Sequence, residues 1–413
     1  MSDRISVAVI GAGASGMMAA GSAAANGAQV TMFERNERVG RKLAITGKGR
    51  CNLTNNCDVE EFMRHVPRNP RFLYAALAAF TPADTMDFFE SLGVPLKTER
   101  GRRVFPVSDK AYDIVDALRS FCVKSGVHII SERVKSVTTE GDTVTGVITE
   151  SGRKLGFDRV IVATGGLSYP TTGSDGDGYG FARELGIKVT ETSPSLVPLE
   201  TEGNVCSELS GLTLKNVSLT ICDDRTSKEV FSEQGELLFA HFGITGPLVL
   251  SASAHMEDRG GYTAKIDFKP ALDEKTLNER LLSDFEKYKN RDMINACSDL
   301  LPQAVIPHML RAAGIDSSLK CHSLTKAARL SLLRTLKAFP LKIAGKRPIE
   351  EAVITRGGVD VKELSPKTME SRRVHGLYFC GEVIDVDAYT GGYNLQIAFS
   401  TGRAAGIAAA NDN

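Results

Sequence analysis

Gly11-Ala12-Gly13-Ala14-Ser15-Gly16 is the stretch that decides the fold class of this chain. It follows the apolar run Ile5–Ile10, which is typical of a buried parallel strand, and it opens a run of small residues typical of a tightly packed helix. The first glycine permits a tight turn, the second lets a pyrophosphate approach the backbone, and the third lets helix and strand pack closely. The helix N-terminus presents free N–H groups to a phosphate. The stretch therefore predicts a βαβ unit that binds a dinucleotide.

A carboxylate ends the second strand expected in this unit. Gly27 turns the chain out of the helix, and the strand Gln29–Glu34 follows it. A carboxylate at this strand end accepts hydrogen bonds from the ribose hydroxyls of a bound adenosine. Because strand, glycine turn, helix and acid occur in this order, an accidental glycine turn is a poor alternative.

The fingerprint does not by itself choose between FAD and NAD, but later segments favour FAD. Gly40-Arg41-Lys42 places cations near the diphosphate, and Ile161–Gly166 is a strand ending in Thr-Gly-Gly, where chain and cofactor pass closely. Gly376–Asp385 is an apolar strand followed by glycine and acids, which suits the ribityl hydroxyls. Gly391–Gln396 begins the last helix, whose N–H groups can meet the flavin pyrimidine oxygen. A nicotinamide domain has no need for this distant return of the chain.

Alternating strands and helices predict an α/β fold with a mainly parallel sheet in the first part of the chain. We expect an ordered loop over Arg38–Asn56 and amphipathic helices over about Asn69–Leu92 and Ala111–Ser125. Strands are expected over Val127–Ile130, Val134–Thr138, Thr143–Thr149 and Arg159–Ala163.

The pattern changes after about Gly186, which predicts an insertion into the α/β domain. Strands without intervening helices are expected over Val189–Thr201, Thr213–Cys222 and Tyr262–Phe268, and helices between about Glu274 and Ala338. The predicted organisation is an FAD-binding domain in two parts, 1–189 and 346–413, around an inserted substrate domain, 190–345, which is β-rich over about 190–272 and helical over about 273–340.

Composition narrows the class of protein. The chain has 413 residues, and its 50 basic and 50 acidic residues give a formal net charge of +0. Nucleic-acid-binding proteins usually carry a basic excess, so we expect no nucleic-acid partner. No apolar stretch is long enough to span a bilayer and no signal peptide is apparent, so we expect no membrane association. The 8 cysteines are scattered, which favours reduced thiols and a cytoplasmic location.

The chain as a whole resembles the BaiN-like or YhiN-like group of bacterial flavoproteins, also described as aminoacetone-oxidase-type FAD enzymes. The most specific segments are Gly47–Asn55, His241–Pro247, Thr355–Val359 and Gly391–Gln396. The resemblance implies a two-dinucleotide-binding-domain flavoprotein fold with an inserted β-rich domain and a helical subdomain, and non-covalent FAD. It also implies NAD(P)H as a possible transient electron donor. Family activities include reducing a double bond conjugated to a ketone in bile acids and oxidising amines, so the reaction does not follow from membership alone.

A second resemblance concerns one segment. Thr172–Gly178 is similar to a segment of the fumarate reductase and ketosteroid dehydrogenase flavoproteins, which supports chemistry on carbon–carbon bonds next to carbonyls. The alternative is that this glycine- and aspartate-rich segment only shapes the flavin cavity.

The residues expected to bind FAD come from the fingerprint, the loop after the second strand, the Thr-Gly-Gly strand end and the C-terminal return. They are Gly11, Gly13, Ala14, Ser15, Gly16, Glu34, Arg35, Arg41, Lys42, Arg50, Cys51, Asn52, Val134, Thr164, Gly165, Gly381, Glu382, Asp385, Asn394, Leu395 and Gln396. We expect no metal site.

Two residues are candidates for acid–base chemistry. His241, in a glycine-rich turn of the inserted domain, is the leading candidate, although a histidine that pins this turn by hydrogen bonds is at least as good an interpretation. Tyr393 can donate a proton, but stacking is favoured. Lys48 and Arg50 can hold an anionic substrate, although the FAD diphosphate is the favoured partner.

Cys51 and Cys57 raise a competing hypothesis, a redox-active cysteine pair of the kind found in flavin disulfide reductases. Their spacing is one residue longer than in that family, and no second Gly-x-Gly-x-x-Gly marks a nicotinamide domain. We therefore disfavour it.

The main hypothesis is an FAD-dependent oxidoreductase that transfers a hydride at flavin N5 to a small organic substrate, with an enone-type double bond preferred. The substrate is expected to lie between the flavin and the inserted domain. The alternatives are an amine oxidase, a flavin-dependent RNA-modifying enzyme and a non-catalytic redox sensor. The oligomeric state does not follow from the sequence.

Overall fold

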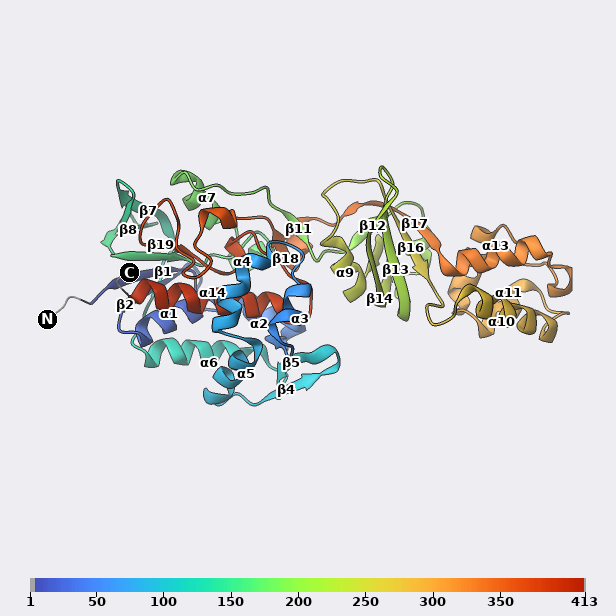
Figure 1. The fold of residues 1–413 in the computed structure, drawn as a ribbon, viewed down its shortest axis with the longest axis horizontal. Coiled ribbons are helices and arrows are strands. Elements are labelled where there is room, and N and C mark those ends of the chain that lie inside the picture. The colour runs from blue at the N-terminus through green and yellow to red at the C-terminus, as the bar shows by residue number, and fades with distance from the viewer. Residues whose placement is uncertain (1–3, 412–413) are drawn as a thin grey trace. The chain divides into compact units, whose positions relative to one another are not determined.

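The computed structural model describes residues 4–411 of the chain (Figure 1). These residues divide into two compact units, which we call the cofactor unit and the inserted unit. The cofactor unit contains residues up to Ser195 and from Ile349 onward, and the inserted unit is Leu196–Pro348. The boundaries predicted from the sequence were 190 and 345.

A five-stranded parallel sheet forms the centre of the cofactor unit, in the order β19-β10-β1-β2-β6. Its strands are β1 (Ser6–Ile10), β2 (Gln29–Glu34), β6 (His128–Ser131), β10 (Arg159–Val162) and β19 (Leu377–Phe379). The short apolar runs of the sequence form the three middle strands because helices cover a parallel sheet on both faces. The predicted α/β class with a mainly parallel sheet is confirmed.

Two helices from opposite ends of the chain pack side by side on this sheet: α1 (Ala14–Ala25) and α14 (Tyr393–Ala410) (Figure 1). Glycines allow the approach, since a Cβ atom on Gly402 would lie 2.4 Å from the Ser15 carbonyl oxygen and one on Gly406 would lie 2.2 Å from that of Ala19. The last helix is therefore held against the helix that opens the fingerprint. A third helix, α6 (Ala111–Lys124), packs against α1 from another side.

Two local predictions in this unit were wrong. Arg38–Asn56 is not only a loop, because it contains α2 (Arg41–Gly49), which breaks at Thr46 and continues through left-handed residues. The single helix expected over Asn69–Leu92 is two helices, α4 (Pro70–Ala79) and α5 (Pro82–Ser91). Thr81 begins α5 with a capping box, and a proline follows it, so the chain restarts there.

Smaller elements complete the cofactor unit. The sheet β3-β5-β4 contains β3 (Thr54–Asn55), β4 (Leu96–Glu99) and β5 (Arg103–Pro106), and β7 (Val134–Glu140), β8 (Thr143–Thr149) and β9 (Lys154–Gly156) form an antiparallel sheet. The strands β11 (Ser193–Ser195) and β18 (Ile354–Arg356) pair next to the two points where the chain leaves and re-enters the unit. The remaining helices of more than one turn are α3 (Val59–Arg64) and α7 (Asp177–Glu184).

The inserted unit contains a closed six-stranded antiparallel barrel. In barrel order its strands are β12 (Leu199–Thr201), β15 (Gly243–Thr245), β14 (Lys228–Ala240), β13 (Thr213–Asp223), β16 (Tyr262–Asp267) and β17 (Phe339–Lys346). The single strand expected over Val189–Thr201 was wrong, because its ends belong to β11 and β12 in different units.

Helices of the inserted unit share one hydrophobic core with the barrel. They are α8 (Val205–Glu208), α9 (Pro247–Ser253), α10 (Glu274–Lys287), α11 (Met293–Ala296), α12 (Ile306–Ala313) and α13 (Lys326–Lys337). Within residues 4–411, no helix is both long and apolar enough to cross a membrane.

Candidate functional site

The glycine fingerprint forms a turn between β1 and α1 that leaves room for a ligand. Gly11 has φ +100°, and a Cβ atom there would lie 2.6 Å from the Ala163 carbonyl oxygen. A Cβ atom on Gly16 would lie 1.8 Å from the Gly11 carbonyl oxygen, whereas one on Gly13 would meet nothing within 4 Å. The outer two glycines are therefore required by packing and the middle one borders open space.

The N-terminus of α1 is free to bind a phosphate. Gly13 is its N-cap and supplies no side-chain acceptor, and the first hydrogen bond inside the helix runs from the Met17 N–H to the Gly13 carbonyl at 3.0 Å. The N–H groups of Ala14, Ser15 and Gly16 have no intrahelical partner and point, with the positive end of the helix dipole, past the open side of Gly13. This is the geometry that the sequence predicted for a diphosphate.

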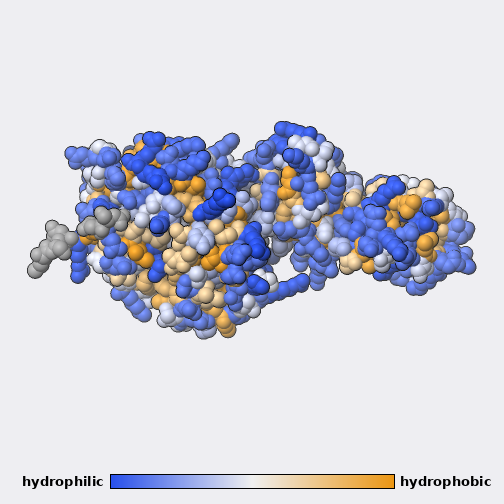
Figure 2. Space-filling view, in the orientation of Figure 1, coloured by the Kyte–Doolittle hydropathy of each residue, from blue (hydrophilic) through white to orange (hydrophobic). Residues whose placement is uncertain are grey.

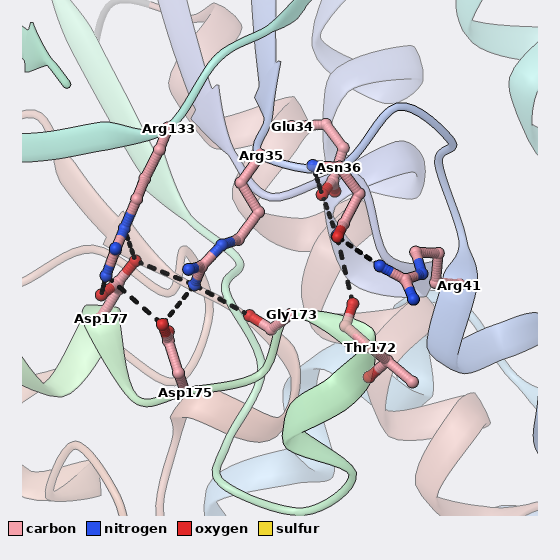
Figure 3. Close-up of polar contacts among 9 residues, drawn as sticks. All are labelled: Glu34, Arg35, Asn36, Arg41, Arg133, Thr172, Gly173, Asp175 and Asp177. Carbon is pink, nitrogen blue, oxygen red and sulfur yellow. Dashed lines mark hydrogen bonds and ion pairs between the residues drawn. The ribbon is translucent and has the colours of Figure 1, made fainter. Parts of the chain in front are cut away.

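Glu34, at the end of β2, connects this turn to the loop that follows it (Figure 3). The carboxylate is 8% exposed and accepts hydrogen bonds from the Ala12 N–H at 2.9 Å, and from the backbone and side-chain nitrogens of Asn36 at 2.9 and 2.7 Å. A carboxylate accepts about four hydrogen bonds, so acceptor capacity remains for a ribose hydroxyl. Asn36 in turn donates to the Thr172 carbonyl at 3.1 Å and accepts from Arg41 at 2.6 Å.

A group of two arginines and two aspartates lies beside Glu34 (Figure 3). Arg35 pairs with Asp175 and lies 3.5 Å from Asp177, while Arg133 binds Asp177 at 2.5 and 2.9 Å and Asp175 at 3.3 Å. The predicted direct role of Arg35 toward the cofactor is weakened, because aspartates from the Thr172–Gly178 segment already neutralise it. These acids hold the segment in place, which is the cavity-shaping alternative given above.

Lys42 and Glu382 also bind each other. The Lys42 Nζ lies 2.5 Å from Glu382 Oε2 and 2.6 Å from the Ser168 hydroxyl. Glu382 Oε1 accepts from the Ser168 hydroxyl at 2.8 Å and from the Thr355 N–H at 2.9 Å. The pair therefore joins the loop after β2, the β10 end and the C-terminal return, and the sequence reasoning, which placed both residues directly on the cofactor, did not foresee it.

Arg50 does not have the free charge that a diphosphate ligand would need. Its guanidinium binds Glu99 at 2.5 Å and Asp109 at 2.6 Å, and it lies 4.2 Å from the centre of the Phe105 ring. The favoured assignment of Arg50 to the FAD diphosphate is therefore not supported by its contacts. Lys48, in contrast, is exposed, with φ +58°, and binds no acid among the described residues.

The cysteine pair is not arranged for redox chemistry. Cys51 and Cys57 are both free thiols. Burial raises the pKa of Cys51 to about 12 and that of Cys57 to about 11, so neither forms the thiolate that attacks a disulfide at neutral pH. This agrees with the interpretation preferred from the sequence.

Several buried polar atoms around the turn have no hydrogen-bond partner among residues 4–411. They include Asn52 Oδ1, Thr164 Oγ1 and Asp385 Oδ1, all from segments predicted to bind FAD. Buried polar groups are nearly always paired in folded proteins, so these atoms are expected to meet a polar ligand. Close packing also marks the neighbouring glycines, because a Cβ atom on Gly165 would lie 2.8 Å from the Ser174 hydroxyl and one on Gly381 would lie 2.4 Å from the Ser15 hydroxyl.

The turn before α14 presents a second free helix N-terminus. Gly391 and Gly392 have φ of +123° and +100°, and a Cβ atom on Gly392 would lie 2.3 Å from the Thr54 carbonyl. No side chain caps the helix, so the backbone N–H groups of Tyr393, Asn394 and Leu395 are available. A flavin pyrimidine edge is the anionic partner that the sequence predicted here.

Side chains at this helix start support the turn and do not point to the cofactor. The Asn394 side chain binds the backbone N–H and carbonyl of Ala388 at 2.9 and 2.7 Å. Gln396 is fully buried, accepts from Thr54 at 2.6 Å, donates to the Phe80 carbonyl at 3.0 Å, and gives its backbone N–H to Gly392. The predicted FAD contact of Gln396 is therefore wrong for its donors, all of which are used inside the protein.

Val134 is buried at the start of β7, where Arg133 precedes it, so its predicted contact would be made by backbone atoms. Of the two acid–base candidates, Tyr393 is 5% exposed and stacks on His65 with ring centres 4.5 Å apart, and burial raises its pKa. Stacking remains its favoured role.

His241 lies in the inserted unit, between β14 and β15. It is exposed and forms no hydrogen bond among the described residues, so nothing in the structure supports a histidine that pins its turn. Its ring packs against Phe242, with centres 5.1 Å apart.

The sequence reasoning missed a buried acidic group next to Asp385. Asp387 is 1% exposed, its Oδ2 accepts from the Ser195 hydroxyl at 2.7 Å, and its Oδ1 has no hydrogen-bond partner. Arg68 lies 3.8 Å from Asp387 and 3.6 Å from Asp385, and burial raises the pKa of Asp387. The alternation Asp-Val-Asp in the C-terminal return was the available signal, because only one of the two acids was assigned a role.

These features together fit FAD. One free helix N-terminus is placed for the diphosphate, one acid for the adenosine ribose, and a second free helix N-terminus for the flavin, with unpaired buried polar atoms from the segments around them. The backbone carries most of these contacts, and the charged side chains mostly bind one another.

Comparisons with known proteins agree with this assignment. Residues 5–408 match the model of the HI0933-like protein Rossmann domain. The chain is 32% identical over 414 residues to the 3-dehydro-bile acid delta(4,6)-reductase of Clostridium scindens, covering 98% of each chain. It is 34% identical over 402 residues to the ribosomal RNA dihydrouridine synthase of Escherichia coli, covering 97% of this chain and 96% of that one.

A solved structure shares the fold. The 3-ketosteroid-delta4-(5alpha)-dehydrogenase of Rhodococcus jostii aligns with 99% of this chain and 97% of its own, at a TM-score of 0.54 and 17% sequence identity. The Rossmann-like FAD-binding flavoenzyme fold predicted from the sequence is confirmed.

Proposed function

The chain belongs to the HI0933-like Rossmann-domain family and is an FAD-dependent oxidoreductase, and on that premise we propose that it reduces a carbon–carbon double bond conjugated to a carbonyl group. The observation that carries the proposal is the uncapped N-terminus of α14, held at the Gly391–Gly392 turn. A helix N-terminus stabilises negative charge on the pyrimidine edge of a flavin, and this favours the reduced, hydride-donating cofactor.

The two relatives carry names that describe the same bond change. A delta(4,6) bile acid with a 3-dehydro group has its double bonds conjugated to a ketone, and the uracil ring of uridine has a double bond conjugated to a carbonyl. In either substrate, FAD supplies a hydride to the carbon remote from the carbonyl, and a proton must reach the neighbouring carbon. NADH or NADPH is the proposed donor that returns two electrons to the protein.

The chain's own residues divide the remaining tasks. The free N–H groups of α1 and the Glu34 carboxylate hold the nucleotide end, and the Lys42–Glu382 pair keeps three segments of the site together. Tyr393 is stacked and buried, so we propose it as a positioning residue. His241, which is exposed and has no hydrogen-bond partner in the described chain, remains the proposed proton donor.

Two substrate classes follow, and each has a relative that supports it. A uracil base in RNA is the first to test, because the relative named for ribosomal RNA is 34% identical to this chain. A small enone of the 3-oxosteroid type is the second, supported by the bile acid relative at 32%. The formal net charge of +0 is the argument against RNA, and it concerns the whole chain and not a local surface.

The test follows the flavin spectrum under anaerobic conditions. The purified protein should be yellow, and acid precipitation should release intact FAD, as expected for a non-covalent cofactor. NADH or NADPH should bleach the flavin, and either an oligouridylate or a 3-oxo-4-ene steroid should restore its colour with saturation of the double bond, measured by mass spectrometry. Flavin that is reoxidised by neither compound would contradict the proposal, and reoxidation by amine-derived imines or by oxygen alone would point to an oxidase.

A further inference from the structure

The hairpin of β4 and β5 carries the feature from which we draw a further inference. The turn between its strands is Arg100-Gly101-Arg102-Arg103, and all four residues are exposed. Figure 2 shows hydrophilic side chains at the end of this hairpin. In a chain whose formal net charge is +0, three arginines in four residues are a strong local excess of positive charge.

The acids of this hairpin are already bound by other cations. Glu99 and Asp109 are the only acidic residues in the segment 96–109, and Arg50 and Lys97 bind both of them. Among residues 4–411, no carboxylate pairs with Arg100, Arg102 or Arg103. Lys97 and Arg50 thus neutralise the two acids and leave the arginines of the turn without a partner.

The turn has a fixed geometry. Gly101 and Arg102 have φ of +75° and +58°, and an arginine rarely adopts such a left-handed conformation. The Asn56 N–H donates to the Arg102 carbonyl at 2.7 Å, and the Arg103 side chain returns to the Arg100 carbonyl at 3.0 Å. Because the backbone is held in a strained form, the guanidinium groups are displayed together and are not free to fold back onto acids.

The same turn is joined directly to the flavin end of the site. The Asn55 side-chain nitrogen donates to the Gly101 carbonyl at 3.0 Å and to the Gly391 carbonyl at 3.0 Å. One amide therefore connects the arginine turn to the turn that begins α14. Whatever enters the site at that edge has the unpaired arginines beside it.

A nucleic acid base that reacts at a flavin must leave its stack, while its phosphates stay outside the site. The phosphates flanking the extruded base then need cations at the rim, and arginine forms paired hydrogen bonds to phosphate. A single carboxylate, as on a bile acid, needs only one guanidinium. Three unpaired arginines beside the flavin turn are the number and arrangement that suit a polyanion.

We propose that Arg100, Arg102 and Arg103 form a docking surface for the phosphodiester backbone of a single-stranded or looped RNA substrate. This inference rests on the RNA-directed form of the proposed function. It assigns a role to a hairpin that none of the FAD contacts uses.

The test measures binding of a fluorescent oligouridylate to the FAD-loaded enzyme by anisotropy, at salt concentrations between about 50 and 200 mM. The variant replaces all three arginines with glutamine. Each lost phosphate contact on a single strand should reduce the salt slope by about 0.7, so the variant should lose a slope of about 2 and bind about tenfold or more weakly at low salt. A variant with lysine at the three positions should recover most of the slope, because charge is retained.

The matched control removes the same charge elsewhere in the cofactor unit. Arg119, Lys124 and Lys154 are exposed and form no side-chain contact with an acid in the described chain, and their glutamine variant should keep the wild-type slope. Equal slopes in the hairpin variant and wild type would overturn the inference, as would equal losses in the two triple variants or no RNA binding by wild type. All variants are first checked for flavin absorbance and melting temperature.

A separate measurement keeps this inference distinct from the proposed function. Reduction of the bound oligouridylate by NADH or NADPH is followed in the same samples. RNA that binds through the hairpin but is never reduced would refute the reaction and leave the docking surface standing. RNA that is reduced with equal affinity by the hairpin variant would refute the docking surface alone. Weaker binding of a bile acid by the hairpin variant, with RNA binding unchanged, would assign the turn to a carboxylate and overturn the proposal.

Discussion

Replacing Glu34 with glutamine should separate cofactor affinity from catalysis. The substitution keeps the size of the side chain and removes its charge, so a charge-assisted hydrogen bond to the adenosine ribose is lost. Such a bond contributes about 1.5–3 kcal/mol, which corresponds to an increase of about 10- to 150-fold in the dissociation constant of FAD.

The structure adds a second effect. The carboxylate of Glu34 accepts from the Ala12 N–H with one oxygen and from Asn36 with the other. An amide in its place has only one oxygen, so its NH₂ group must face one of these N–H donors. A buried donor left unpaired costs about 1–3 kcal/mol, and the cofactor-free variant should therefore also unfold more easily.

The assay titrates cofactor-free protein with FAD and follows quenching of FAD fluorescence, and turnover is then measured at saturating FAD. Glu37→Gln is the matched control, because Glu37 lies three residues away, is exposed and forms no hydrogen bond within residues 4–411. Equal FAD affinities for the two variants would refute the assignment of Glu34 to the ribose. Lost turnover at saturating FAD would mean that Glu34 also acts on the chemistry.

Three further predictions concern other parts of the site. Gly392→Ala should bind FAD weakly or lower its reduction potential and raise the dissociation constant of sulfite about tenfold, since its Cβ atom would meet the Thr54 carbonyl at 2.3 Å, whereas Gly180→Ala, with nothing within 4 Å, should behave as wild type; equal potentials would refute the role of α14. A double serine variant of Cys51 and Cys57 should still take up two electrons per subunit in an anaerobic reductive titration, because burial raises the pKa of these thiols to about 12 and about 11, and a higher uptake by wild type would restore the disulfide hypothesis. Burial raises the pKa of Asp387, so the folded protein holds this proton more tightly than the unfolded chain and loses stability as pH rises; Asp387→Asn should therefore melt above wild type at about pH 8, and the difference should close toward about pH 4, while a difference independent of pH would contradict the reasoning.

Part of the fold followed from local patterns. The glycine fingerprint, the parallel strands and the last helix depend on steric rules that act within a few residues, and the structure has them where they were expected. The break at Thr81 was missed although its signal was local, because the amphipathic period runs through it and hides the capping box.

The barrel of the inserted unit was not predicted. β14 and β17 were not recognised as strands, although β14 spans Lys228–Ala240, because a closed antiparallel barrel is defined by pairing between segments far apart in the chain. β17, for example, pairs with both β12 and β16. No periodicity within a single segment contains that information.

The sequence alone determined which backbone segments surround the cofactor, because glycines at Gly11, Gly13, Gly16 and Gly392 are needed wherever main chain and ligand meet closely. Only the tertiary structure decided which charged side chains remain available there. Arg50 was assigned to the cofactor by its type and position, yet two acids from distant segments neutralise it, whereas Arg100–Arg103 was given no role and is left unpaired. The physical reason is that a charge interacts with whatever lies within a few ångströms in space, and proximity in space between distant segments is a property of the fold.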